Sequence, residues 1–168
     1  MLVGFSQVRF DGEFEFRMGG TFVNYMQSET EFHTALYCSA WAVKAGENSF
    51  IWVSVDCARF MESDANYVRE KVERLRTVSV APWCDPVCMA DEIRALIESK
   101  TGIPADNVII AATHTHTGPT ARPSISPFFP KGDLSYFEKL GDKTAQACIE
   151  AWNNAAEATI SYGRCDED

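Results

Sequence analysis

The sequence has few basic residues, few histidines and no long apolar run. It has 15 lysines and arginines against 24 aspartates and glutamates, which gives the 168 residues a formal net charge of −9 at pH 7. Because the basic residues are also dispersed, we do not expect a surface that follows the phosphates of a nucleic acid. No apolar run approaches the roughly 20 residues that a membrane-spanning helix needs. The sequence therefore predicts a globular protein without nucleic-acid binding or a membrane span.

The six cysteines lack the spacing of a redox or zinc motif. Three residues separate Cys84 from Cys88, whereas a redox pair has two, and no second pair follows to complete a zinc knuckle. Four of the six cysteines lie in apolar or helical contexts that are typical of small buried side chains. We therefore expect reduced thiols.

The amino-terminal part of the chain indicates strands. At 46% hydrophobic residues, the 168-residue chain fits one domain with a sizeable core. Residues 1–10 alternate weakly and are a candidate first strand, and residues 21–32 are polar and predict a loop. Two further strands, over residues 36–45 and 50–55, are joined by Gly46-Glu47-Asn48 and predict a hairpin. The strand over 50–55 is almost wholly apolar, so we expect it to be central.

Later segments have apolar residues at helical spacing, which predicts helices over residues 63–75, 87–99 and 133–156. An apolar, β-branched run over residues 108–112 predicts a buried strand. Because helices separate it from the strand over 50–55, we expect a crossover that leaves these two strands adjacent and parallel. Proline-rich loops are expected over 77–86 and 120–131, and a last short strand over 159–162. The expected fold is α/β, a mixed central sheet with flanking helices in a single layered domain spanning residues 1–168.

A histidine pair follows the apolar strand over residues 108–112. His114 and His116 are two of the three histidines in the chain, and Gly118-Pro119 ends the segment. If the extended backbone continues to His116, the two imidazoles project to the same side. They would then stand at the carboxyl end of a strand, where open α/β sheets usually hold their ligands. Spacing alone also fits histidines that only hydrogen-bond to nearby backbone.

Asp56 stands at the end of the strand over residues 50–55. A carboxylate at the end of a buried strand is costly unless it has a partner. A metal ion or a metal-bound imidazole would be such a partner, because carboxylates commonly hold a ligand histidine by its far nitrogen. Asp56 is therefore a candidate to orient His114, with the cap of a following helix as the alternative.

The segment over residues 112–119, Ala-Thr-His-Thr-His-Thr-Gly-Pro, closely resembles the Thr-His-Thr-His-Ser-Gly-Pro motif of the neutral/alkaline (non-lysosomal) ceramidase family. The resemblance is strong from about Gly102 to Pro119, and it extends to the strands near residues 36–57 and to the helix and strand over 136–163. It departs from the family at the amino end. Family members commonly carry Ile-Thr-Pro there, whereas this chain has Val8-Arg9-Phe10-Asp11.

The resemblance implies a zinc-dependent hydrolase of sphingolipid metabolism, which cleaves the amide bond of N-acylsphingosine or a related lipid amide with metal-activated water. It assigns His114 to the zinc ion and His116 to catalysis beside the substrate. In the family, another histidine, a glutamate and a tyrosine from much later in the chain complete the metal site. We therefore expect residues 1–168 to be the amino-terminal part of a longer hydrolase. The remainder of the polypeptide or a second subunit would complete the site.

Arg122, in the loop after the motif, is a further candidate for contact with the substrate. Two other functions remain open. One is a non-catalytic metal-binding or interaction domain, and the other is an unrelated α/β enzyme with Cys57 as its nucleophile.

The amino terminus bears on localisation. Residues 1–4 lack the basic region and long apolar core of a signal peptide. The chain as written is therefore expected to be cytoplasmic. A secreted or periplasmic protein of this family would carry its signal upstream of Met1.

Overall fold

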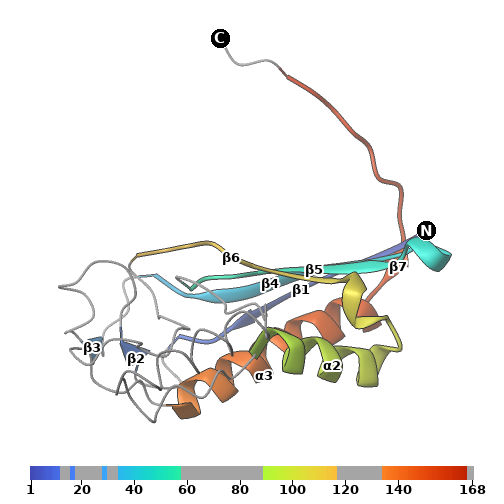
Figure 1. Cartoon of the computed structure of the whole chain (residues 1–168). Helices are drawn as coiled ribbons and strands as arrows, with labels where there is room; N and C mark the ends of the chain where they lie inside the picture. The colour runs from blue at the N-terminus through green and yellow to red at the C-terminus, as the bar shows by residue number, and fades with distance from the viewer. Residues whose placement is uncertain (12–15, 18–27, 30–33, 58–88, 117–133, 166–168) are drawn as a thin grey trace, which may run out of the picture.

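The computed structural model describes residues 1–11, 16–17, 28–29, 34–57, 89–116 and 134–165. Five strands form one mixed sheet in the order β6-β5-β4-β1-β7, and two helices pack against one of its faces (Figure 1). The predicted α/β class is therefore confirmed. The strands and helices of this layer are β1 (Leu2–Arg9), β4 (Tyr37–Lys44), β5 (Phe50–Val55), α2 (Met89–Thr101), β6 (Val108–Ala112), α3 (Leu134–Asn153) and β7 (Ala156–Glu157).

The predicted hairpin is confirmed. β4 and β5 pair antiparallel, with Trp41 opposite Trp52, and a short 3-10 helix, η2 (Gly46–Asn48), joins them. Gly46 has a φ of 61°, in the left-handed region that glycine adopts at little cost. Because a strand exposes alternate residues to each face, this register places the buried Ile51 and Val53 on the helix side of the sheet.

The predicted crossover is also confirmed. β5 and β6 pair parallel, with Val53 opposite Ile110, and α2 lies between them in the chain. The helix ends at a glycine: Gly102 has a φ of 74°, and its N–H donates to the carbonyl of Glu98 at 2.8 Å. The 3-10 turn η3 (Ala105–Asn107) then leads directly into β6.

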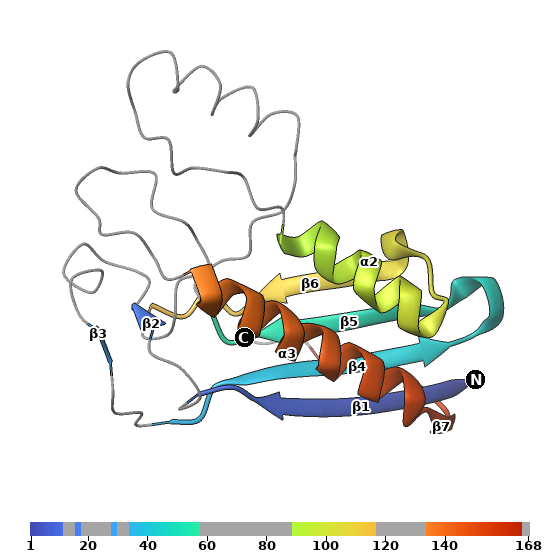
Figure 2. The same cartoon turned by 90° about the horizontal axis from the view of Figure 1, so that it is seen from below.

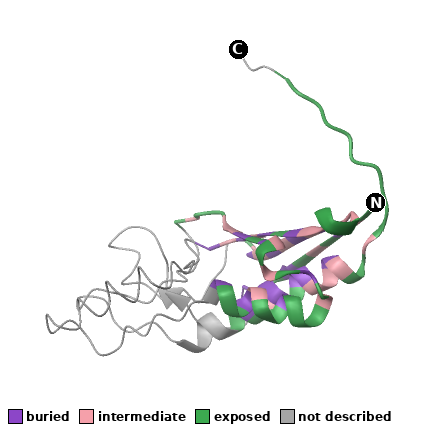
Figure 3. Ribbon diagram, turned by 45° about the vertical axis from the view of Figure 1, so that its right-hand side comes forward, coloured by how far each residue is buried: buried purple, intermediate pink, exposed green. Residues whose placement is uncertain are grey.

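The core lies between the sheet and the two helices. In the view from the helix side, α3 runs across the sheet beside α2 (Figure 2). Buried residues gather between the two layers (Figure 3). The two layers approach closely at Gly4 of β1, where a Cβ atom would lie 1.9 Å from the carbonyl oxygen of Ala151 in α3. Glycine therefore lets the helix backbone touch the strand. The helices contribute Ala90, Ile93, Ile97, Leu140, Ala145, Ala147, Cys148 and Ala151 to this core.

The carboxyl-terminal prediction needs correction. The last strand is β7 at Ala156–Glu157 rather than residues 159–162, and α3 ends at Asn153 rather than at residue 156. β7 pairs only with Leu2 and Val3, and the N–H of Ala158 donates to the carbonyl of Met1. Residues 159–162 lie outside the sheet and are exposed.

A second, smaller ladder joins β2 (Phe16–Arg17) to β3 (Ser28–Glu29). The sequence predicted a loop throughout residues 21–32, so β3 corrects that prediction for two residues. The predictions over residues 63–75, 77–86 and 120–131 lie outside the described residues. Of the helices in the described ranges, none has the length and hydropathy needed to cross a membrane.

Candidate functional site

The carboxyl ends of β5 and β6 and the amino end of β4 meet at one edge of the sheet, because β4 runs antiparallel to β5 and β6 runs parallel to it. The chain after β6 stays attached to the chain after β5. The N–H of Thr113 donates to the carbonyl of Val55 at 2.9 Å, and the N–H of His114 donates to the carbonyl of Cys57 at 3.1 Å. Backbone hydrogen bonds therefore fix where the histidine segment begins.

The two histidine rings lie together, although not for the reason that the sequence suggested. The extended backbone ends at Ala112, and His114 has a φ of 61°, in the left-handed region. Regular strand alternation therefore does not reach His116, which corrects that expectation. The imidazoles of His114 and His116 are nevertheless stacked, with ring centroids 5.3 Å apart and an angle of 27° between their planes. Both residues are exposed.

The left-handed conformation of His114 is itself informative. It is the only positive φ among the non-glycine residues in the described part of the chain. Such a conformation costs on the order of 1 kcal/mol, and it persists when surrounding contacts impose it. Here the hydrogen bond from His114 to Cys57 supplies such a contact. Strained backbone of this kind is concentrated at functional sites.

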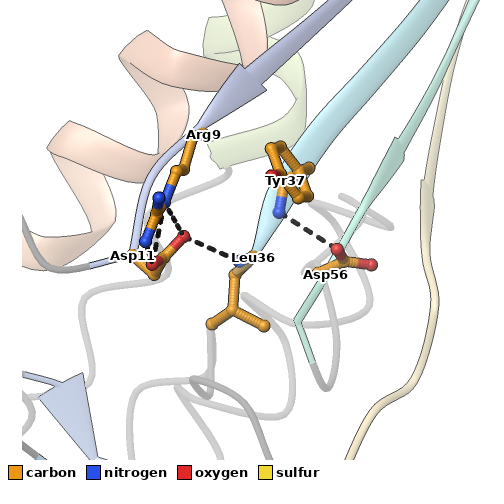
Figure 4. Close-up of polar contacts among 5 residues, drawn as sticks. All are labelled: Arg9, Asp11, Leu36, Tyr37 and Asp56. Atoms are coloured by element: carbon orange, nitrogen blue, oxygen red, sulfur yellow. Dashed lines mark hydrogen bonds and ion pairs between the residues drawn. The ribbon is translucent and has the colours of Figure 1, made fainter. Parts of the chain in front are cut away.

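Asp56 lies at the same edge and contacts β4. Its Oδ2 accepts the N–H of Tyr37 at 3.0 Å, and its own N–H donates to the carbonyl of Tyr37 at 3.0 Å (Figure 4). The carboxylate thus satisfies a backbone donor at the beginning of β4. Its role as the partner of His114 stays a prediction, and the alternative helix cap would involve residues from 58 onward, outside the described residues.

Sequence reasoning missed a second carboxylate at this edge. Asp11 is buried, and its Oδ1 accepts the N–H of Leu36 at 2.7 Å. Arg9 binds the same carboxylate with two nitrogens, Nε at 2.9 Å and Nη2 at 2.6 Å. The Arg9 hydrogen bonds lower the pKa of Asp11, the Leu36 N–H adds to this effect, and burial opposes it. The spacing of Arg9 and Asp11 could have predicted this ion pair, because residues two apart lie on the same side of an extended chain.

Asp11 and Asp56 therefore accept hydrogen bonds from the backbone of two consecutive residues. One carboxylate holds the N–H of Leu36 and the other holds the N–H of Tyr37 (Figure 4). An unpaired backbone N–H at a buried or half-buried position is costly, so the two carboxylates stabilise the beginning of β4. They fix the edge at which the histidines stand.

The histidine pair fits part of a zinc site. Zinc takes three or four protein ligands, and a neutral imidazole is one of the commonest. In the ranges that the structure describes, no three histidine, cysteine, aspartate or glutamate side chains gather as a metal site. The rings of His114 and His116 are exposed, so polypeptide other than the described residues can reach them. They therefore suit a site to which other polypeptide contributes the remaining ligands.

The described cysteines are thiols outside any disulfide, as expected. Cys38, Cys57 and Cys148 are buried, and Cys165 is exposed. Burial raises the pKa of Cys38 and of Cys148 to about 12, so both are neutral thiols at physiological pH. Cys57 has no exposed surface, which argues against a nucleophile that meets substrate there. Arg122, Cys84 and Cys88 lie outside the described residues.

The fold can be compared with solved structures. The neutral ceramidase from Pseudomonas aeruginosa matches this chain with a TM-score of 0.64, and a structure of ceramidase complexed with C2 matches with a TM-score of 0.65. Each match covers 92% of this chain. This is the fold of part of a ceramidase. Sequence identity is 16% in both cases, so the similarity concerns the fold alone.

The match covers only a small part of each ceramidase chain. It covers 22% of the first ceramidase chain and 21% of the second, so this chain spans about a fifth of their length. No protein-family model and no curated protein sequence matches the chain. The match in three-dimensional structure confirms the resemblance to neutral ceramidase that the histidine motif indicated.

Proposed function

We propose that this chain is the amino-terminal part of a longer zinc-dependent hydrolase, which cleaves the amide bond of N-acylsphingosine or a related lipid amide. One observation carries the proposal. The fold matches neutral ceramidase over 92% of the chain, and in this fold the ceramidase-like motif presents two exposed imidazoles at the carboxyl end of β6. Sequence motif and fold point to the same family although overall identity is low.

His114 and His116 have different roles in this proposal. His114 holds the zinc ion, and its backbone is fixed by the hydrogen bond to Cys57. A zinc ion held by His114 and by ligands from further polypeptide would supply Lewis-acid polarisation of the amide carbonyl and a water molecule with a lowered pKa. His116, stacked on the ligand ring, donates a hydrogen bond or a proton as negative charge develops on the carbonyl oxygen.

Two more residues belong to the proposed site. Asp56 directly follows β5, the strand that pairs with β6, and His114 follows β6. The negative charge of Asp56 would favour an imidazole that binds metal. Arg122 is proposed as a substrate contact. The remaining zinc ligands come from the rest of the polypeptide or from a second subunit in this proposal, because no three ligating side chains gather as a metal site in the described ranges.

The deciding experiment uses the protein translated from the complete reading frame. Zinc content is measured by inductively coupled plasma mass spectrometry, and hydrolysis is measured on a fluorescent N-acylsphingosine. We expect His114→Ala to lose both zinc and hydrolysis, because a site with few protein ligands loses most of its affinity with one ligand. The control is Glu47→Ala, at an exposed residue of η2 at the opposite end of β5, which should keep both.

Three results would speak against parts of the proposal. Zinc and hydrolysis that survive His114→Ala would reject the assignment of the motif. Zinc bound through His114 without hydrolysis of any lipid amide would favour the alternative, a non-catalytic metal-binding or interaction domain. Residues 1–168 alone should bind zinc weakly and hydrolyse nothing, so tight binding that depends on Cys84 and Cys88 would show that the metal site lies elsewhere.

A further inference from the structure

The two faces of the sheet differ in what covers them. α2 and α3 both pack on one face, and none of the described elements packs on the other (Figure 1). Residues that point toward the helices identify the covered side: Gly4 touches α3, and the hydroxyl of Ser6 donates to Glu150 of α3 at 2.7 Å. Since side chains alternate along a strand, Phe5, between them, points to the other side. We call that side the open face.

A continuous row of large apolar residues crosses the open face. The strand register pairs Phe5 with Trp41, Trp41 with Trp52, and Trp52 with Ile109, so the row crosses β1, β4, β5 and β6. Phe50 packs edge-on against Trp41, with ring centroids 5.2 Å apart. Phe5 is 69% exposed, Trp52 40% and Ile109 43%. Scattered apolar residues are ordinary on protein surfaces, but a contiguous patch marks an interaction site.

The composition of the open face narrows the kind of partner. The described residues of β1, β4, β5 and β6 that alternate onto this face include one charged side chain, Arg9, which is paired with Asp11. A membrane surface or a nucleic acid would favour a face with several basic residues. An uncharged aromatic face instead suits burial against another apolar polypeptide layer.

The length of the matched ceramidase chains gives a further reason to expect such a layer. β5 and β6 pair parallel, with Trp52 opposite Ile109. Here Trp52 and Ile109, which form the exposed part of the row on that parallel pair, have no described element over them. The matched ceramidase chains have more polypeptide to supply a cover, since this chain matches 22% of one and 21% of the other.

We propose that the open face is an internal interface, covered in the complete protein by an apolar layer of the same polypeptide outside residues 1–168. This inference rests on the proposed function, because it requires the longer hydrolase. It adds the place at which the rest of that polypeptide docks. The same docking would bring further polypeptide beside the sheet edge that carries His114 and His116.

Hydroxyl-radical labelling with mass spectrometry tests the proposal without a substitution. It is applied to the protein from the complete reading frame and to residues 1–168 alone. We expect Phe5 and Trp52 to be labelled in the short chain and to lose most of that labelling in the complete protein. Leu96, 37% exposed on α2, is the matched internal control and should be labelled in both.

A pair of substitutions gives a second measurement. Trp52→Glu and Leu96→Glu each place a charge at a position of nearly equal exposure in this chain. In the complete protein we expect Trp52→Glu to lower the melting temperature by several degrees, because the charge would be buried. Leu96→Glu should leave the melting temperature nearly unchanged. In residues 1–168 alone, the two variants should have similar melting temperatures.

The outcomes separate this proposal from the proposed function. Full labelling of Phe5 and Trp52 in the complete protein overturns the interface, even if zinc and hydrolysis still depend on His114. Protection with zinc content that is indifferent to His114→Ala supports the interface and rejects the proposed function. Protection in residues 1–168 alone that rises with protein concentration shows that a second copy covers the face. Protection that appears only with lipid vesicles shows a lipid surface. Either result overturns the proposal.

Discussion

Two pairs of polar residues share one edge of the sheet, and they differ in what their side chains contact. The carboxylates of Asp11 and Asp56 accept the backbone N–H groups of the consecutive residues Leu36 and Tyr37. The rings of His114 and His116 are exposed and stacked on each other. The carboxylates therefore belong to the framework of the edge, whereas the imidazoles remain reachable from solvent.

The difference shows that residues which stabilise the backbone and residues which can bind a ligand can lie close together at one edge of a sheet. Backbone donors at the beginning of β4 need acceptors, and the carboxylates supply them. A backbone held in this way gives the neighbouring strand ends a fixed position. Groups that react or bind metal need the opposite environment, because a ligand must reach them. The predictions below test this division, beginning with the largest expected effect.

Replacement of His116 tests the reactive side of the division. In the complete protein, His116→Ala should keep its zinc and lose roughly 10²–10⁴-fold in the rate of amide hydrolysis, the usual contribution of a general acid or an oxyanion donor. Zinc content and turnover are measured on the same sample. If His116→Ala empties the site while His114→Ala leaves it filled, the two roles are reversed.

Replacement of Asp11 tests the framework side. Asp11→Ala leaves the N–H of Leu36 without its acceptor, so the free energy of unfolding should fall by about 1–3 kcal/mol. Arg9→Ala is the matched control. The Arg9 side chain is largely exposed and water can replace part of its ion pair, so Arg9→Ala should destabilise the fold less than Asp11→Ala does. Urea unfolding of residues 1–168 measures both variants, and an equal or larger loss for Arg9→Ala would refute the importance of the Leu36 contact.

Asp56 stands between the two groups, and Asp56→Asn separates its two possible roles. The asparagine carbonyl can still accept the N–H of Tyr37, so the free energy of unfolding should change by less than about 0.5 kcal/mol. The lost charge should weaken zinc binding by the complete protein about 10-fold, as expected for a carboxylate that supports a ligand imidazole. Unchanged zinc affinity in both Asp56→Asn and Asp56→Ala would limit Asp56 to the framework.

The smallest effect concerns acid stability. Because Arg9 lowers the pKa of Asp11 in the folded state, Asp11 contributes stability at pH values above its unfolded pKa of about 3.9. That contribution is lost as the pH falls from about 4 through the lower folded pKa. Asp11→Asn should therefore lose less stability than the unmodified chain when the pH is lowered from about 5 to about 3. Parallel pH dependences would show that the ion pair adds nothing.

The sequence predicted the central strands well because their patterns are local. The apolar run over residues 50–55 coincides with β5, and the run over 108–112 coincides with β6. The same local reasoning failed at the carboxyl end. β7 forms by pairing with Leu2 and Val3 of β1, and a pattern within residues 156–162 carries no information about that pairing.

The candidate site was predictable in part. The motif identified His114 and His116, and the crossover rule placed them near the end of β5. Asp11 was missed because its partners, Arg9 and the distant Leu36, meet only when β1 and β4 pair. The two rings were expected on the same side of a continuous strand, whereas they stack on each other with His114 in a left-handed conformation.

The sequence by itself determined the central strands, the hairpin, the parallel crossover and the two histidines as candidate site residues. Hydrophobic periodicity, turn residues and a distinctive motif are all local properties of the chain. Only the tertiary structure decided the conformation of His114, the acceptors for Leu36 and Tyr37, and the exposure of the open face. Those features depend on backbone hydrogen bonds and packing between segments far apart in sequence, and hydrophobic periodicity within one segment does not encode them.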